Sequence, residues 1–178
     1  MAKKNLGSFF DEQKKNKPLP RSLIEQLSNE AWREVGLDFL EYLAGLRTNP
    51  SWYATNSYSV SFKGKRVCLI RIDPPSYPRG DRLLIHINDF EKQTIEAHLA
   101  EITEEEKRHY FDGIRHCGRC ADCAPGVTLM IGGVAMDEMC GRHPERLHFS
   151  YRNPTAEQLC AIKELIALRR QSIMDGLA

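Results

Sequence analysis

Four of the six cysteines fall within one short stretch of the chain, and their spacing is typical of a metal site. Cys117, Cys120 and Cys123 follow one another at intervals of three, and Cys140 comes after sixteen intervening residues. A Cys-x-x-Cys turn lets two thiolates converge on one tetrahedral cation, and a second short turn can complete the coordination. Thiolates outcompete imidazole for a soft site where both can reach the metal. We therefore expect these four cysteines to bind one structural zinc ion, with His143 as the reserve ligand.

Two other uses of the same cysteines stay open. Three cysteines at this spacing plus a remote one also match an iron–sulfur cluster, although Cys140 is followed by Gly141 and not by the proline of the ferredoxin pattern. A Cys-x-x-Cys at the start of a helix can instead cycle between dithiol and disulfide, but glycine and proline surround this one. Cys68 and Cys160 lie in apolar patterns and are expected to be buried thiols.

No motif for an enzyme reaction accompanies the cysteines. The chain has no Walker loop, no dinucleotide fingerprint and no nucleophile elbow, and its six histidines are scattered. These features favour a non-enzymatic binding protein, whose partner would be an unidentified small molecule or protein. A further hypothesis is a small-molecule pocket on the sheet, lined by the aromatic residues Trp52, Tyr53, Tyr58 and Phe62.

The overall charge excludes some classes of partner. The 178 residues include 25 basic and 24 acidic ones, so no net field draws the chain to nucleic acid or to an anionic membrane. No apolar stretch is long enough to cross a bilayer, and the N-terminus lacks the apolar core of a secretory signal. We therefore expect a cytoplasmic protein with neither a membrane nor a nucleic-acid partner, in which the cysteines are thiols or metal ligands and not disulfides.

The helices and strands expected from the sequence indicate that the cysteines are positioned by an α+β fold with one domain. Residues 1–21 are expected to be a flexible tail, and residues 22–178 a single domain that includes the cysteine-rich segment 116–148. Apolar residues recur with helical spacing from Ser22 to Leu46, which predicts one long helix or two helices broken near Ser28. The domain would be a small, mainly antiparallel sheet packed by the N- and C-terminal helices.

Alternation of apolar and polar residues predicts the strands. Tyr58 to Phe62, the turn Lys63-Gly64-Lys65 and Val67 to Ile72 form a β-hairpin, and Arg82 to Ile87 forms a third strand. Two short helices are expected at Phe90–Ala100 and Thr103–Phe111.

The cysteine-rich segment contains a short hairpin of its own in this prediction. Val127–Ile131 and the residues from Val134 onward would form this hairpin between Cys123 and Cys140, and Leu147–Tyr151 would form another strand. A terminal helix follows, capped by Thr155 with Gln158 at its third position, and its apolar stripe is Leu159, Ile162, Leu165, Ile166 and Ile173.

This order of elements resembles the bacterial YdhG-like superfamily. The similar parts are Tyr58–Ile72 with its Lys63-Gly64 turn, Leu83–Ile87, and Phe149–Arg170 with Asn153-Pro154. The resemblance covers roughly half of the chain and implies the α+β scaffold. Most members are uncharacterised and one branch is linked to iron delivery, but no ligand motif of that branch matches residues here. The cysteine segment looks like an insertion relative to the simpler members.

Overall fold

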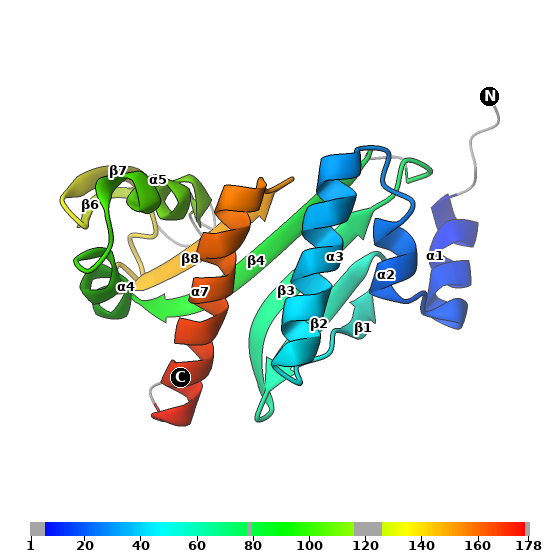
Figure 1. Cartoon of the computed structure of the whole chain (residues 1–178), viewed down its shortest axis with the longest axis horizontal. Coiled ribbons are helices and arrows are strands. Elements are labelled where there is room, and N and C mark those ends of the chain that lie inside the picture. The colour runs from blue at the N-terminus through cyan, green and yellow to red at the C-terminus, as the bar shows by residue number, and fades with distance from the viewer. Residues whose placement is uncertain (1–5, 78–79, 116–125, 177–178) are drawn as a thin grey trace.

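The computed structural model describes residues 6–77, 80–115 and 126–176, and its fold is α+β, as the sequence predicts. An antiparallel sheet of six strands has the order β1-β2-β3-β4-β8-β5. Its strands are β1 (Ser51–Ala54), β2 (Ser57–Phe62), β3 (Lys65–Asp73), β4 (Arg82–Glu91), β5 (Ile114–Arg115) and β8 (Arg146–Arg152). A separate two-stranded sheet consists of β6 (Val127–Ile131) and β7 (Val134–Met139) (Figure 1).

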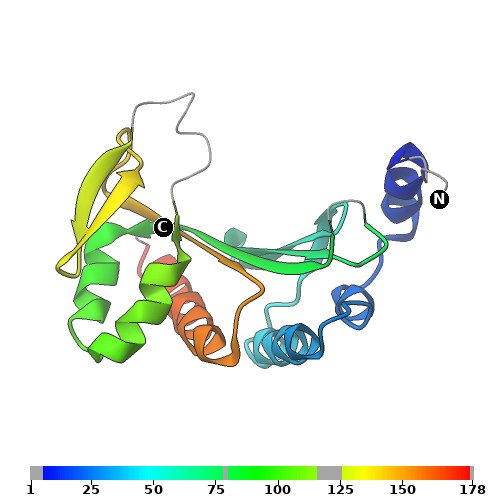
Figure 2. The same cartoon turned by 90° about the horizontal axis from the view of Figure 1, so that it is seen from above.

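The helices leave one face of the large sheet open. The described helices are α1 (Leu6–Asn16), α2 (Pro20–Ile24), α3 (Glu30–Gly45), α4 (Lys92–Leu99), α5 (Glu104–Gly113) and α7 (Ala156–Met174). Figure 2 shows α2, α3 and α7 beneath the sheet, whereas no helix of the described residues covers the middle of the opposite face. We call that opposite face the bare face.

The register of the strands separates a core row from a bare row. Tyr58, Ile70, Ile85 and Tyr151 pair with one another across β2, β3, β4 and β8, and each is at most 2 % exposed. Since side chains alternate between the two faces of a strand, the next residues along each strand point to the bare face. The helices therefore bury one set of side chains, and the strand residues between them remain available on the other side.

Several local signals produce the elements that the sequence predicts. Lys63 and Gly64 both have positive φ, 48° and 77°, as a two-residue hairpin turn between β2 and β3 requires. The N-terminal helical pattern is broken, because Asn29 caps α3 by accepting a hydrogen bond from the backbone N–H of Trp32. Thr155 and Gln158 form the predicted capping box at the start of α7.

The apolar stripe of α7 is buried as expected at Leu159, Ile162, Leu165 and Ile166, and Ile173 is partly buried against the same core. Two short strands, β1 and β5, were not predicted from the sequence. Both are too short to show an alternating pattern.

The N-terminal segment, expected to be a tail, contains α1 and makes a specific contact with the turn between β1 and β2. Gln13 of α1 is buried and forms two hydrogen bonds with Asn56, one of them from the backbone N–H of Asn56 at 2.9 Å. No helix in the described part of the chain is both long and apolar enough to cross a membrane.

Candidate functional site

The predicted zinc ligands are only in part among the described residues. Cys117, Cys120 and Cys123 lie outside them. Cys140 follows β7 directly, is 4 % exposed and has a free thiol. The reserve ligand His143 has an exposed side chain whose Nδ1 is 3.4 Å from Oε1 of Glu145. Within the described ranges no three His, Cys, Asp or Glu side chains form a group that could hold a metal ion.

The two remaining cysteines differ in exposure, and the expectation for Cys160 was wrong. Cys68 is buried as expected, but Cys160 is exposed on α7. Cys160 lies on the outer surface of the helix, next to the buried Leu159 and Ala161, so its apolar neighbours in sequence misled the prediction.

We expect a thiol-reactive probe to label Cys160 quickly and Cys68 only on unfolding. Burial raises the pKa of the Cys68 thiol far above its ordinary value, so almost no reactive thiolate forms at neutral pH, whereas Cys160 is open to the reagent. Mass spectrometry of peptides after brief alkylation, with and without urea, measures both sites. Equal labelling of the two thiols in the folded protein would contradict this burial.

The four aromatic residues proposed as a pocket do not share one surface. Tyr58 is buried in the core, where its hydroxyl donates to the carbonyl oxygen of Pro18 at 2.6 Å. Tyr53 is exposed and its ring lies 4.7 Å from the guanidinium carbon of Arg66. Trp52 and Phe62 are both partly buried against the core.

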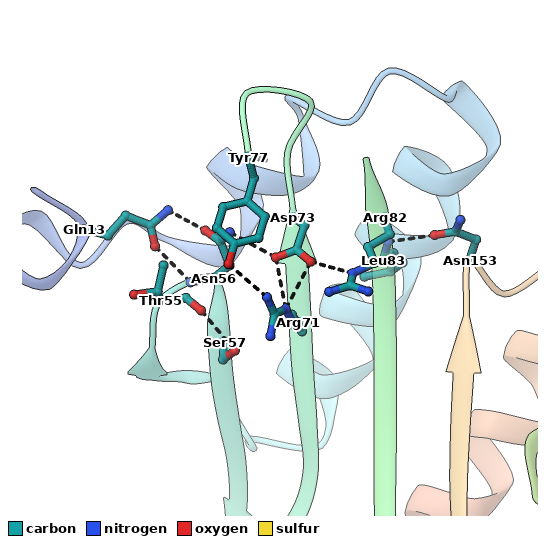
Figure 3. Close-up of polar contacts among 10 residues, drawn as sticks. All are labelled: Gln13, Thr55, Asn56, Ser57, Arg71, Asp73, Tyr77, Arg82, Leu83 and Asn153. Atoms are coloured by element: carbon teal, nitrogen blue, oxygen red, sulfur yellow. Dashed lines mark hydrogen bonds and ion pairs between the residues drawn. The ribbon is translucent and has the colours of Figure 1, made fainter. Parts of the chain in front are cut away.

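A network of charged and amide side chains lies at one end of the sheet (Figure 3). The Asp73 side chain at the end of β3 is fully buried. It accepts hydrogen bonds from Nε of Arg71 at 3.0 Å and from Nε of Arg82 at 2.5 Å. The amide of Asn56 donates to the same carboxylate at 3.1 Å. Asp73 thus holds two arginines from two neighbouring strands in fixed positions.

The same network ties five segments of the chain together, namely α1, the turn between β1 and β2, β3, the loop after β3, and β4. Asn56 connects Asp73 to Gln13 of α1, and Nη2 of Arg71 donates to the hydroxyl of Tyr77 at 3.3 Å. Tyr77 lies in the loop between β3 and β4, and its ring also stacks on Arg71, 5.6 Å from the guanidinium carbon. The loop residue Tyr77 therefore lies beside Arg71, and α1 is joined to the network through Asn56.

Arg71 and Arg82 keep other nitrogen atoms available. Each uses Nε for Asp73, and no residue of the described chain forms a hydrogen bond with Nη1 of Arg71 or with either terminal nitrogen of Arg82. None of these nitrogens is among the buried atoms without a partner, so they reach solvent. Terminal guanidinium nitrogens in this arrangement can donate to an oxyanion.

A histidine lies on the same face as the two arginines. His86 of β4 is opposite Leu69 of β3 and Ser150 of β8. Its pKa is lowered, mainly by partial burial and further by the positive charges of Arg71 and Arg82. The surroundings of His86 are therefore positively charged, and the ring itself is neutral at pH 7.

The structure also brings together a histidine, a tyrosine and a glutamate that no sequence spacing indicated. The Nε2 of His98 lies 2.7 Å from the hydroxyl of Tyr110, which donates to the carboxylate of Glu164. Tyr110 is buried and its pKa is raised, mainly by burial and then by this carboxylate, so the phenol stays protonated. The group joins α4, α5 and α7, and we interpret it as a structural contact.

Arg71, Asp73 and Arg82 were not predicted from the sequence as site residues, and neither was Arg152 of β8, which is directly opposite Leu84 of β4. The available signal was that Arg71 and Asp73 alternate with Ile70 and Ile72, which places the charged pair on the face opposite the core. Their partners on β4 and β8 follow only from the register of strand pairing.

No protein-family model, no curated protein and no solved structure matches the chain. The similarity to the YdhG-like superfamily therefore stays a prediction.

Proposed function

We propose that the chain is a non-enzymatic metal-binding module in which Cys117, Cys120, Cys123 and Cys140 hold one structural zinc ion. The observation that carries the proposal is the burial of Cys140 at the end of β7. A buried thiol at the end of a hairpin, with three more cysteines closely spaced in the sequence, is what a four-thiolate zinc site requires.

The described residues within the cysteine-rich segment support this assignment. Val127 pairs with Met139, the residue before Cys140. Gly126 lies against the same strand, because a Cβ built on it would be 2.8 Å from Cα of Glu138. Cys123 precedes Gly126 by three residues, and three residues of extended chain span at most about 10 Å. Chain length therefore permits Cys123 to share a tetrahedral site with Cys140.

Four thiolates would fill the coordination shell of zinc and leave no open position for a substrate. Such a site contributes folding free energy and not catalysis. In this proposal the metal fixes the β6–β7 hairpin beside the large sheet.

The purified protein is expected to contain one zinc ion per chain, and Cys120→Ser and Cys140→Ser are each expected to reduce that content sharply and to lower Tm. Metal-binding free energy at a structural site is also folding free energy, so both readouts should change together. Elemental analysis after purification without added metal, combined with thermal unfolding, measures them.

Cys68→Ser is the matched control, because Cys68 is also a buried free thiol but lies in β3, away from the β6–β7 hairpin. It should lower Tm modestly and leave the zinc content unchanged. A brown protein with sulfur-to-iron absorbance after anaerobic purification would show that the cysteines bind an iron–sulfur cluster and not zinc. A folded, metal-free protein with a reversible Cys117–Cys120 disulfide would show that the cysteines serve thiol redox chemistry and not metal binding.

A further inference from the structure

The bare face of the sheet carries a cross of side chains centred on Leu84. Arg71 of β3 and Arg152 of β8 are directly opposite Leu84 on its two sides. Arg82 and His86 lie two residues before and after it on β4 and so share its face. Three arginines and one histidine therefore surround a single half-buried leucine.

The cross has an excess of positive charge that ion pairs among the described residues do not neutralise. Asp73 is the only acidic partner of Arg71 and Arg82 within 4.0 Å in the described chain, and Arg152 forms no ion pair there. Three guanidinium groups and one carboxylate leave two net positive charges. The side chains of Arg71 and Arg82 are 26 % and 18 % exposed, so their charges are only partly screened by water.

Two of the three arginines are held in position before any ligand binds. Asp73, which is fully buried, fixes Arg71 and Arg82 through Nε and leaves terminal nitrogens toward the bare face. Figure 3 shows both guanidinium groups on the same side of the strands, with Tyr77 beside Arg71. Held side chains lose less conformational entropy on binding than free ones, and this makes a fixed arginine pair a better anion site than surface lysines.

We propose that the side chains around Leu84 bind the carboxylate or phosphate group of a small organic anion, whose apolar part lies on Leu84 and Leu69. The planar guanidinium fork matches both of these oxyanions. Leu69 is opposite His86, and both leucines are partly exposed, which gives an apolar floor next to the charges. This site is independent of the metal site proposed above, since none of its residues belongs to the cysteine segment.

The test uses a matched set of probes on the full-length protein. Benzoate and phenyl phosphate carry a carboxylate and a phosphate on the same ring, and benzamide is the uncharged counterpart. NMR of the arginine Nε–Hε groups and of the His86 ring follows binding. We expect shifts for Arg71, Arg82 and His86 with one or both anions, none with benzamide, and weaker binding at higher ionic strength. The more tightly bound anion identifies the oxyanion class.

Two variants each remove one outward-facing guanidinium group while the fold is kept. Arg152→Gln removes a guanidinium that takes no part in the Asp73 network and should weaken anion binding about tenfold, the loss of one charge-assisted hydrogen bond. Arg82→Lys leaves an ammonium for Asp73 but no free fork, and should weaken binding similarly. Arg108→Gln, at an exposed position on α5, makes the same charge change as Arg152→Gln away from the cross and should bind like the wild type.

A second readout is the pKa of His86, which faces Arg71 on β3, the uncharged Ser150 on β8, and Arg82 on its own strand. A bound oxyanion should raise this pKa, because it offsets the two arginine charges. Equal affinity of the wild type and Arg152→Gln, or equal binding of benzamide and benzoate, would overturn the proposal. So would tight binding of a single-stranded oligonucleotide with no response to either small anion, which would assign the bare face to nucleic acid.

Discussion

Asp73→Ala is expected to lower the free energy of unfolding by about 3 kcal/mol. The buried carboxylate accepts hydrogen bonds from Arg71, Arg82 and Asn56, and its removal leaves all three donors without an acceptor. Breaking a buried ion pair by removing one partner costs about 3–5 kcal/mol, and the lower end applies because both arginines are partly exposed to water. Urea denaturation measures the change as a lower midpoint at unchanged slope.

Asp38→Ala is the matched control for this prediction. Asp38 accepts a hydrogen bond from Nζ of Lys163 at 2.7 Å and links α3 to α7, but its side chain is 56 % exposed. An exposed pair contributes only about 0–1 kcal/mol, so its loss should be small. If both variants lost the same stability, the Asp73 network would not be the connection between α1, β2, β3 and β4 that its geometry indicates.

Signals confined to a few neighbouring residues were sufficient to predict most of the fold. The Lys63-Gly64 turn supplies the two positive φ angles of a tight hairpin, and Thr155 with Gln158 satisfies the first backbone N–H groups of α7. Each of these signals stabilises one conformation regardless of what packs against it. The hairpin predicted at 127–131 and beyond is confirmed for the same reason, with Gly132 and Gly133 at its turn.

The bare-face site could not be predicted because it depends on contacts between distant segments. Asp73 meets Arg82 across an eight-residue loop, and Arg152 reaches the cross only because β8 pairs with β4. The alternation of apolar and charged residues along β3 shows that Arg71 and Ile70 lie on opposite faces of the sheet. It does not show which face the helices cover, because that depends on the tertiary structure. Helix α1 was missed for a similar reason, since its buried Gln13 is hydrogen-bonded to Asn56, which is 43 residues away in the sequence.

The two proposed sites are held in place by different parts of the chain. The metal site would stabilise the hairpin that follows β5, whereas the arginines are held without any metal by a buried carboxylate near α1. Loss of zinc should therefore leave anion binding largely intact in protein that stays folded. A Cys140→Ser variant that loses zinc and still binds benzoate or phenyl phosphate would separate the two functions.

Gly113 lies at the junction of α5 and β5, in close contact with Tyr151. It is the last residue of α5 and directly precedes β5, whose Ile114 and Arg115 pair with β8. A Cβ built on Gly113 would lie 2.2 Å from Cζ of Tyr151. Tyr151 has no room to withdraw, because it is buried and its hydroxyl donates to the carbonyl oxygen of His109 at 3.0 Å.

Gly113→Ala is therefore expected to lower the free energy of unfolding by about 3 kcal/mol, at the upper end of the cost of overpacking a core. The added methyl must displace either the Tyr151 ring or the junction of α5 and β5. The first movement disturbs the packing of Tyr151 in the core, and the second disturbs the pairing of β5 with β8. Gly45→Ala is the control, since Gly45 lies at the exposed end of α3 with no neighbouring atom within 4 Å of a new Cβ. That change should be neutral or stabilising by up to about 1 kcal/mol, through the higher helix propensity of alanine. Chemical denaturation of the two variants beside the wild type measures both effects, and wild-type stability of Gly113→Ala would show that the Tyr151 ring can move at little cost.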